Sequence, residues 1–305
     1  MIDIVKNDTA TIPIDFLCSH FGVSRSGFYN WQQRDKEPVT LVNKEKICEA
    51  IRVIFKDSKK TYGSPRVYDD LKERGFKVSE NTVAKYMQEM GLDARLKKKF
   101  RIQTTDSNHS SPIADRLFKI EDHHNMPSGP GEVLAGDITY LKMGDSFLYL
   151  AVVIDIYSRA VVGWSIQRSL HTKLVLDALA AAMSKVGPDA EVIFHSDRGS
   201  QYASEAYRSF CDASGVMPSM SRRGNCYDNA FVESWFGGFK KEWLYRHSYS
   251  TEKELRAIVF EYIEVWYNRK RKHSALGYRS PMKLSLIHIS EPTRRTPISY
   301  AVFCL

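Results

Sequence analysis

Apolar positions in the first third of the chain recur with the spacing of helices. Residues 14–34 predict two short helices separated at Gly22, and residues 44–56 predict one longer amphipathic helix. A second pair of helices is predicted over residues 64–74 and 80–90. Each pair is typical of a helix-turn-helix unit, and two such units in tandem favour a DNA-binding role.

The helix predicted over residues 80–90 has the features of a recognition helix. Ser79 can cap its first turn, and its polar side carries Lys85, which we expect to contact DNA. A short helical hairpin that binds nothing is the alternative interpretation. We therefore predict that residues 1–101, which end in a basic run, form an all-α region of tandem helix-turn-helix units.

The pattern changes after residues 102–130, whose Ser, Asp, His, Pro and Gly content is typical of a linker. From there, apolar runs of strand length precede an alternation of helices and strands. The predicted strands cover 133–143, 147–156, 160–167, 191–196 and 216–221, and the predicted helices cover 172–185, 204–214, 227–244 and 252–268. This order predicts an α/β domain with a mixed five-stranded sheet and flanking helices.

Composition narrows the class of protein. The 305 residues are 43% hydrophobic and 26% charged, as in ordinary globular proteins, and the net charge of +8 favours a polyanionic partner such as nucleic acid. No apolar run reaches the ~20 residues of a membrane span. Five scattered cysteines form no C-x-x-C pair, which argues against a disulfide framework or zinc knuckle and favours the cytoplasm.

Three acidic residues lie in or beside apolar segments, where an unpaired carboxylate is energetically unfavourable. Asp137 lies inside an apolar strand, Asp197 follows a buried strand, and Glu233 lies on a helix. Each one alone is best explained as a surface cap or an ion-pair member. Brought together, they would repel one another and raise one another's pKa, a conflict that a divalent cation with hard oxygen ligands resolves. Asp155, at the end of another apolar strand, is better explained as a turn cap than as a fourth ligand.

The spacing and the flanking residues carry a family resemblance. Thirty-five residues separate Asp197 from Glu233, as in the D-D-(35)-E core of retroviral integrases and many transposases. The neighbouring motifs are Gly136-Asp137-Ile138-Thr139-Tyr140, Asp155-Ile156-Tyr157-Ser158-Arg159, His195-Ser196-Asp197-Arg198-Gly199, Tyr227-Asp228-Asn229-Ala230 and Tyr267-Asn268-Arg269-Lys270-Arg271. Together they resemble the second-frame (OrfB-type) transposases of the IS3 insertion-sequence family. The similarity covers about residues 14–284.

The resemblance implies a ribonuclease-H-like integrase core over residues 131–284, with Asp137, Asp197 and Glu233 as catalytic residues and metal ligands. It implies cleavage and transfer of DNA strands with two Mg²⁺ or Mn²⁺ ions. The implied partners are element ends and target DNA, further copies of the chain, and an upstream-frame (OrfA-type) protein or fusion. The implied location is the bacterial cytoplasm, in association with the nucleoid.

Further residues are candidate DNA contacts because they are basic or polar and flank the carboxylates or lie in the basic C-terminal segment. They are Lys240, Asn229, Arg222, Arg223, Arg269 and Arg271. Asn229 is equally placed to orient Glu233, one helical turn away. His195 is better explained as a packed side chain than as a ligand.

Two other functions fit the same sequence. A non-catalytic regulator of transposition would bind DNA regardless of Glu233, and another ribonuclease-H-like nuclease would hydrolyse DNA without joining strands. Residues 285–305 follow neither period and resemble a sequencing adapter translated in one frame. We therefore expect this tail to be an artefact and no part of the fold.

Overall fold

The computed structural model describes residues 13–34, 39–94, 112–119, 122, 126–186, 191–222 and 229–284. The chain divides into two compact units, Met1–Arg95 and Leu96–Leu305, and each is described by itself. In the described parts of the chain, no helix is both long and apolar enough to cross a membrane.

The first helix pair of the N-terminal unit consists of α2 (Ile14–His20) and α3 (Arg25–Arg34). Gly22 lies between them with a φ of 63°, a left-handed conformation that glycine adopts without strain. The Ser24 hydroxyl accepts a hydrogen bond from the Gly27 backbone N–H at 3.0 Å and so caps the start of α3. The predicted first pair is therefore confirmed.

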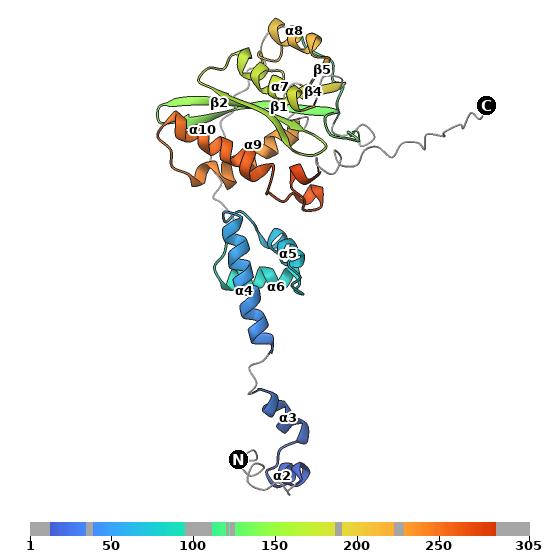
Figure 1. Ribbon diagram of the computed structural model, residues 1–305, viewed down its shortest axis with the longest axis vertical. Coiled ribbons are helices and arrows are strands. Elements are labelled where there is room, and N and C mark those ends of the chain that lie inside the picture. The colour runs from blue at the N-terminus through green and yellow to red at the C-terminus, as the bar shows by residue number, and fades with distance from the viewer. Residues whose placement is uncertain are drawn as a thin grey trace, which may run out of the picture. The chain divides into compact units, whose positions relative to one another are not determined.

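Three further helices, α4 (Val39–Asp57), α5 (Ser64–Glu73) and α6 (Glu80–Glu89), pack together in the N-terminal unit (Figure 1). The Ser79 hydroxyl accepts a hydrogen bond from the Thr82 N–H, which is the predicted cap of α6. Apolar side chains from all three helices form the core: Ile51, Ile54, Phe55, Val67, Leu71, Val83 and Met87. The second helix-turn-helix pair is thus held by a core of its own.

The C-terminal unit is built on a five-stranded sheet with the strand order β3-β2-β1-β4-β5. The strands are β1 (Val133–Met143), β2 (Ser146–Asp155), β3 (Val161–Gln167), β4 (Val192–Ser196) and β5 (Val216–Met220). The first three are antiparallel neighbours, whereas β4 runs parallel to both β1 and β5. The predicted mixed sheet is confirmed.

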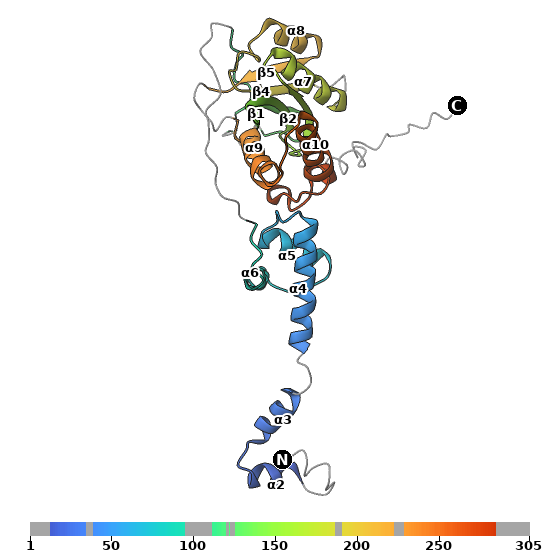
Figure 2. The ribbon, with the colours of Figure 1, turned by 90° about the vertical axis from the view of Figure 1, so that its left-hand side faces the viewer.

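Helices cover both faces of this sheet. Figures 1 and 2 show α7 (Thr172–Val186) and α8 (Glu205–Ala213) on one face, and α9 (Ala230–Glu242) and α10 (Glu252–Phe260) on the other. Gly163 of β3 allows α7 to pack against the sheet, because a Cβ at this position would lie 2.1 Å from a backbone oxygen of α7. Strand alternation places Asp137 on the face that α9 covers.

Part of the predicted linker packs against the sheet. Ser219 of β5 is fully buried, and its hydroxyl accepts hydrogen bonds from the backbone N–H groups of Leu117 (3.0 Å) and Phe118 (3.1 Å). The Met220 N–H donates to the Asp115 carbonyl at 3.3 Å, and the Phe118 ring is buried. Residues 112–119 therefore cover the β5 edge, which would otherwise present unpaired backbone groups.

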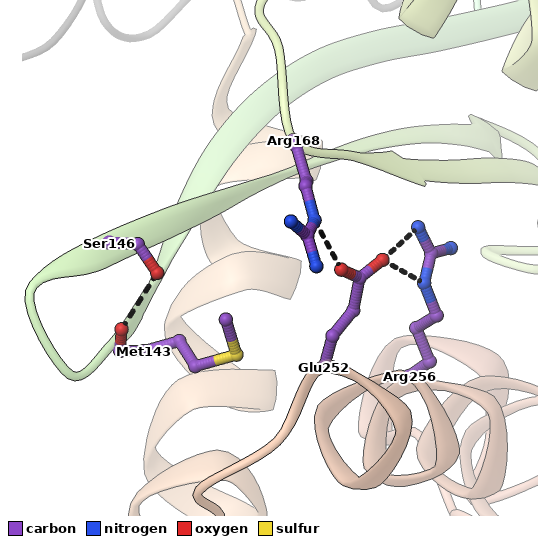
Figure 3. A network of polar contacts seen from close by, with 5 residues as sticks. All are labelled: Met143, Ser146, Arg168, Glu252 and Arg256. Atoms are coloured by element: carbon purple, nitrogen blue, oxygen red, sulfur yellow. Dashed lines mark hydrogen bonds and ion pairs between the residues drawn. The ribbon is translucent and has the colours of Figure 1, made fainter.

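The start of α10 is fixed by a capping box and by an ion-pair network. The Thr251 hydroxyl accepts from the Glu254 N–H, and the Glu254 carboxylate accepts from the Thr251 N–H. Figure 3 shows the Glu252 carboxylate between two guanidinium groups, Arg168 at 2.6 Å from one oxygen and Arg256 at 2.7 Å from the other. Arg168 follows β3, so these pairs join the helix to the sheet.

The apolar period over 252–268 predicted one continuous helix, but the helix in the structure changes type along its length. After α10, residues Glu261–Tyr267 continue as a π-helix. At its end, the Asn268 side chain donates to the Val161 carbonyl and accepts from the Val161 N–H, each at 2.9 Å. This pair of bonds occupies the edge of β3 and fixes the end of the helix, an interaction that the helical pattern does not encode.

Candidate active site

Parallel pairing of β1 and β4 brings Asp137 and Asp197 together. The paired residues end at Ala135 of β1 and His195 of β4, which lie opposite each other. Asp137 and Asp197 each lie two residues beyond this last pair. Pairing stops at the same level on both strands, so the two carboxylates lie close together where β4 ends and β1 continues without it.

The Asp137 carboxylate is in an unfavourable setting for a charge. Its side chain keeps a partly accessible surface, yet burial is the largest cause that raises its pKa well above the usual range, and the negative charges of Asp197 and Glu233 raise it further. The Ile138 N–H, 2.7 Å from Asp137 Oδ1, and the Lys240 ammonium act in the opposite direction. Both other predicted carboxylates therefore act on Asp137.

Backbone and aromatic groups surround Asp197. Its Oδ1 atom accepts a hydrogen bond from the Gly199 N–H at 3.0 Å. Tyr202 is almost fully buried nearby, and the pKa of its phenol is raised well above its usual value by burial, with further contributions from Asp137 and Asp197. The Tyr202 phenol therefore lies near the two aspartates, while its ring packs against Phe194 and Tyr207.

Helix α9 carries Glu233 to the same place. Val232, Trp235 and Phe239 are buried on the inner side of this helix, and Glu233 is half-buried. One turn before Glu233, the Asn229 side-chain N–H donates to the Gly136 carbonyl at 3.2 Å. Because Gly136 precedes Asp137, this bond ties the start of α9 to the strand that carries the first aspartate.

A second contact ties the other end of α9 to β1. The Lys240 ammonium donates to the Thr139 hydroxyl at 2.7 Å and lies 5.1 Å from the centre of the Tyr140 ring. Thr139 is buried and lies on the same face of β1 as Asp137, two residues away. Asn229 and Lys240 therefore hold α9 on both sides of Glu233.

The side chains of Asp137, Asp197 and Glu233 are of the type that binds divalent cations, although they are not yet close enough together to form a complete metal site. Within the described ranges, no three His, Cys, Asp or Glu side chains are already gathered as a metal-ligand group. Mutual repulsion of buried carboxylates favours such a looser arrangement. Mg²⁺ and Mn²⁺ prefer hard oxygen ligands such as these carboxylates. A bound ion would also stabilise the ionised form of Asp137, whose pKa is raised.

Two neighbouring groups have structural roles. Asp155 is buried, and its carboxylate accepts hydrogen bonds from the Gly131 N–H (3.1 Å), the Ser158 N–H (3.0 Å) and the Ser158 hydroxyl. This geometry is a turn cap, as the sequence favoured. His195 is buried, and its Nδ1 lies 2.9 Å from the Ser219 hydroxyl, which agrees with a packed histidine.

The predicted DNA contacts divide into accessible and buried residues. Arg271 is 7% exposed and its guanidinium makes a bidentate ion pair with Glu242, with N···O distances of 2.6 and 2.7 Å. This arrangement argues against the predicted DNA contact of Arg271, because the charge is already paired inside the protein. Asn229, 5% exposed and bound to Gly136, is likewise placed to position α9 rather than to touch DNA.

The remaining candidates stay predictions. Lys85 is exposed on α6, Arg222 is exposed after β5, and Arg269 is exposed with its Nε donating to the Glu264 carbonyl. Arg223 lies outside the described residues.

Sequence reasoning missed two residues that border the carboxylates. Thr139 carries a signal that was available, since strand alternation places it on the face of Asp137. Tyr202 carries none, because its approach to both aspartates depends on how the loop after β4 folds.

Family models match most of both units. An integrase core domain matches residues 127–226, a second integrase core domain model matches residues 214–281, and an HTH-like domain matches residues 43–100. Among solved structures, the simian T-cell lymphotropic virus intasome in complex with PP2A regulatory subunit B56 gamma matches with a TM-score of 0.46 and 15% identity, over 74% of this chain and 71% of that chain. The HTLV-2 integrase catalytic core domain in complex with magnesium matches with a TM-score of 0.40 and 17% identity, over 51% of this chain and 97% of that one.

Curated relatives are more similar. The transposase InsF for insertion sequence IS3A of Escherichia coli (strain K12) is 38% identical over 278 residues, which are 91% of this chain and 95% of the relative. An uncharacterized 31 kDa protein of insertion element IS600 from Shigella sonnei is 38% identical over 265 residues, or 87% of this chain and 96% of the relative. With these relatives and the two domain matches, the chain belongs to the IS3 family of DNA transposases.

Proposed function

We propose that Asp137, Asp197 and Glu233 are the catalytic carboxylates of this transposase, and that they cleave and transfer DNA strands at element ends. The observation that carries the proposal is the position of the two aspartates, each two residues beyond the last β1–β4 pair. The raised pKa of Asp137, to which both other acids contribute, supports the inclusion of Glu233.

The three carboxylates are proposed to hold two Mg²⁺ or Mn²⁺ ions in the active complex. Such ions, when bound, supply the Lewis acidity that activates a water or 3′-hydroxyl and stabilises the leaving oxygen of a phosphodiester. The ions also offset the repulsion among the acids, which otherwise favours a protonated Asp137.

Other residues of the chain act by position and charge. The Lys240 ammonium lies near Asp137 and favours the ionised carboxylate, and it supplies positive charge where a DNA phosphate would approach. Asn229 holds the start of α9 against Gly136 and so limits movement of Glu233 relative to Asp137. Together these contacts preorganise the site before DNA arrives.

The partners follow from the same proposal. DNA is the substrate, and exposed Lys85 on α6 with Arg222 and Arg269 in the C-terminal unit are its proposed further contacts. A multimer of this chain would hold two element ends, with an upstream-frame protein or fusion as an additional partner. The relatives' identity as insertion-sequence transposases supports this view, and such a protein would act in the cytoplasm at the nucleoid.

A strand-transfer reversal assay on branched DNA tests the proposal. The substrate mimics an element end joined to target, so it needs only the catalytic unit to act. The wild-type chain is expected to resolve the branch with Mg²⁺ or Mn²⁺, and Glu233→Gln is expected to lose the activity while still binding the DNA. Glu261→Gln, at an exposed position on the π-helix, is the matched control that keeps activity.

The outcomes separate the three candidate functions. Metal-dependent joining that is lost in Glu233→Gln supports a DNA strand transferase. Cleavage without joining indicates a nuclease, and DNA binding by an inert wild-type chain indicates a regulator. Either of the last two results would contradict the proposal.

A further inference from the structure

One edge of β1 is open beside the carboxylates. Pairing with β4 ends at Ala135, so in the described part of the chain no strand pairs with this edge from Gly136 to Met143. Four aromatic side chains lie on the β1–β2 hairpin and on the segment after α9, and we call them the aromatic track: Tyr140, Phe147, Tyr245 and Tyr249.

The members of the aromatic track are close to one another or to the same strand. The Tyr140 and Phe147 rings meet edge to face with centres 5.6 Å apart. The Tyr245 phenol, on the turn after α9, lies close enough to Tyr140 that this neighbour adds to the rise in its pKa that burial causes. The Tyr249 hydroxyl donates to the Lys142 carbonyl at 3.0 Å, which fixes the loop before α10 along the strand.

The aromatic track is accessible and lies among positive charges. Phe147 is 41% exposed and Tyr245 is 42% exposed, so both rings can be covered by a partner. The Lys240 ammonium lies 5.1 Å from the Tyr140 ring centre, and exposed Lys142 lies opposite Phe147 in the strand register. The turn between β1 and β2, at the end of the aromatic track away from Asp137, carries an acidic residue, Asp145.

The aromatic track continues directly from the catalytic carboxylates. Lys240 joins the two, since it is bonded to Thr139 and Thr139 lies two residues after Asp137. From Asp137 to Lys142 the strand rises about 17 Å at ~3.4 Å per residue, which is the length of about five stacked bases. Tyr140 and Phe147 point to the face of the sheet opposite Asp137, so a DNA strand that places a phosphate at the carboxylates would cross the open edge of β1 beside Lys240 to reach these rings.

We propose that the aromatic track binds an unpaired DNA strand next to the scissile phosphate, with bases stacked on Phe147 and Tyr245. This inference rests on the proposed function, because it takes Asp137 as the reacting end. Bases in a duplex are already stacked on one another and are not available to exposed rings. Exposed aromatics interleaved with lysines therefore fit unpaired nucleotides better than intact duplex.

The test compares two fluorescein-labelled DNA probes in EDTA, where no chemistry occurs. One is a blunt mixed-sequence duplex, and the other has the same duplex with a five-nucleotide single-stranded extension that contains 2-aminopurine. Fluorescence anisotropy gives the affinity, and quenching of 2-aminopurine reports stacking. The full-length chain is compared with Phe147→Ala, Tyr245→Ala, Tyr245→Phe and, as a control at another exposed aromatic, Phe260→Ala.

We expect Phe147→Ala and Tyr245→Ala each to lower affinity for the extended duplex by about 5- to 150-fold, the range for loss of one base–aromatic stack. Both should reduce the quenching, whereas affinity for the blunt duplex should hardly change. Tyr245→Phe, which keeps the ring, and Phe260→Ala should behave like the wild type.

Two results would overturn the proposal. An equal loss of affinity for both probes would make this surface a duplex contact, and unchanged affinity and quenching would assign the rings to a protein partner. Failure of the proposed function is distinguishable, because it would appear in the branched-DNA assay as cleavage without joining, as an inert wild-type chain or as branch resolution by Glu233→Gln, whereas the stacking measurement needs no catalysis.

Discussion

Replacement of Arg271 by methionine is expected to destabilise the C-terminal unit strongly. The guanidinium binds both oxygens of Glu242 at 2.6 and 2.7 Å, and its Nη1 lies 2.8 Å from His273 Nε2. The Arg271 and Glu242 side chains are only 9% and 18% exposed. The substitution removes the bidentate partner of the Glu242 carboxylate and leaves Arg246 as the other positive charge that acts on it.

The expected loss is about 3–5 kcal/mol in the free energy of unfolding, the range for removal of one partner of a buried ion pair. Urea unfolding measures it, with tryptophan fluorescence as the signal. Trp243 follows Glu242 and stacks on Trp266 with ring centres 6.1 Å apart, so the probe lies at the perturbed site. With a slope of about 2–3 kcal/mol per molar urea, the midpoint should fall by about 1–2.5 M.

Two controls decide the interpretation. Arg271→Met combined with Glu242→Leu should recover most of the stability, because the Glu242 carboxylate is no longer left inside the protein without its bidentate partner. Arg269→Met, at a neighbouring exposed position, should change stability by less than about 0.5 kcal/mol. The reasoning is refuted if Arg271→Met keeps the wild-type midpoint but weakens DNA binding, since that result would restore the predicted DNA contact.

Three further predictions concern packing, the packed linker segment and the site. Gly136→Ala should cost about 1–3 kcal/mol in urea unfolding, because the new Cβ would lie 2.3 Å from Phe194 Cζ, and an unchanged midpoint would contradict that contact. Ser219→Ala removes the acceptor for two backbone N–H groups and should cost about 1–3 kcal/mol; it should also speed proteolysis within residues 112–119, and unaltered cleavage would refute their packing. Asp137 has a raised pKa, so the folded protein holds this proton to higher pH than the unfolded chain, and without added metal its contribution to stability falls as pH rises from about 4 through the raised value. Asp137→Asn should therefore show a Tm advantage that grows with pH in calorimetry, and a pH-independent difference would contradict the shift.

The sheet and its carboxylates could be predicted because local pattern determines them. The β1 strand begins and ends where the apolar pattern placed it, at Val133 and Met143, since its mainly apolar residues are bounded by Gly131 and Gly144, both at positive φ. Asp137 and Asp197 were recognisable as acids in apolar strand surroundings. Their approach follows from one topological fact, the parallel pairing of β1 with β4.

The roles of single polar side chains could not be predicted because they depend on distant partners. Arg271 lies in a basic, aromatic-rich segment typical of a DNA contact, but Glu242, twenty-nine residues earlier, pairs with it inside the fold. Asn268 bonds to Val161, more than one hundred residues away, and ends the π-helix that the apolar period could not distinguish from an α-helix. Residues 112–119 had a linker composition, and the groups that hold them, the Ser219 hydroxyl and the Met220 N–H, lie about one hundred residues further along the chain.

Metal dependence of an Asp197→Cys variant tests most directly whether the carboxylates bind the ions that drive strand transfer. A thiolate is a poor ligand for Mg²⁺ and a better one for softer divalent ions such as Mn²⁺. The branched-DNA assay with this variant should show no resolution in Mg²⁺ and partial recovery in Mn²⁺, whereas Asp212→Cys, at an exposed position on α8, should resolve the branch in both metals. Equal activity of Asp197→Cys in the two metals would contradict direct ligation by Asp197 and with it the proposed site.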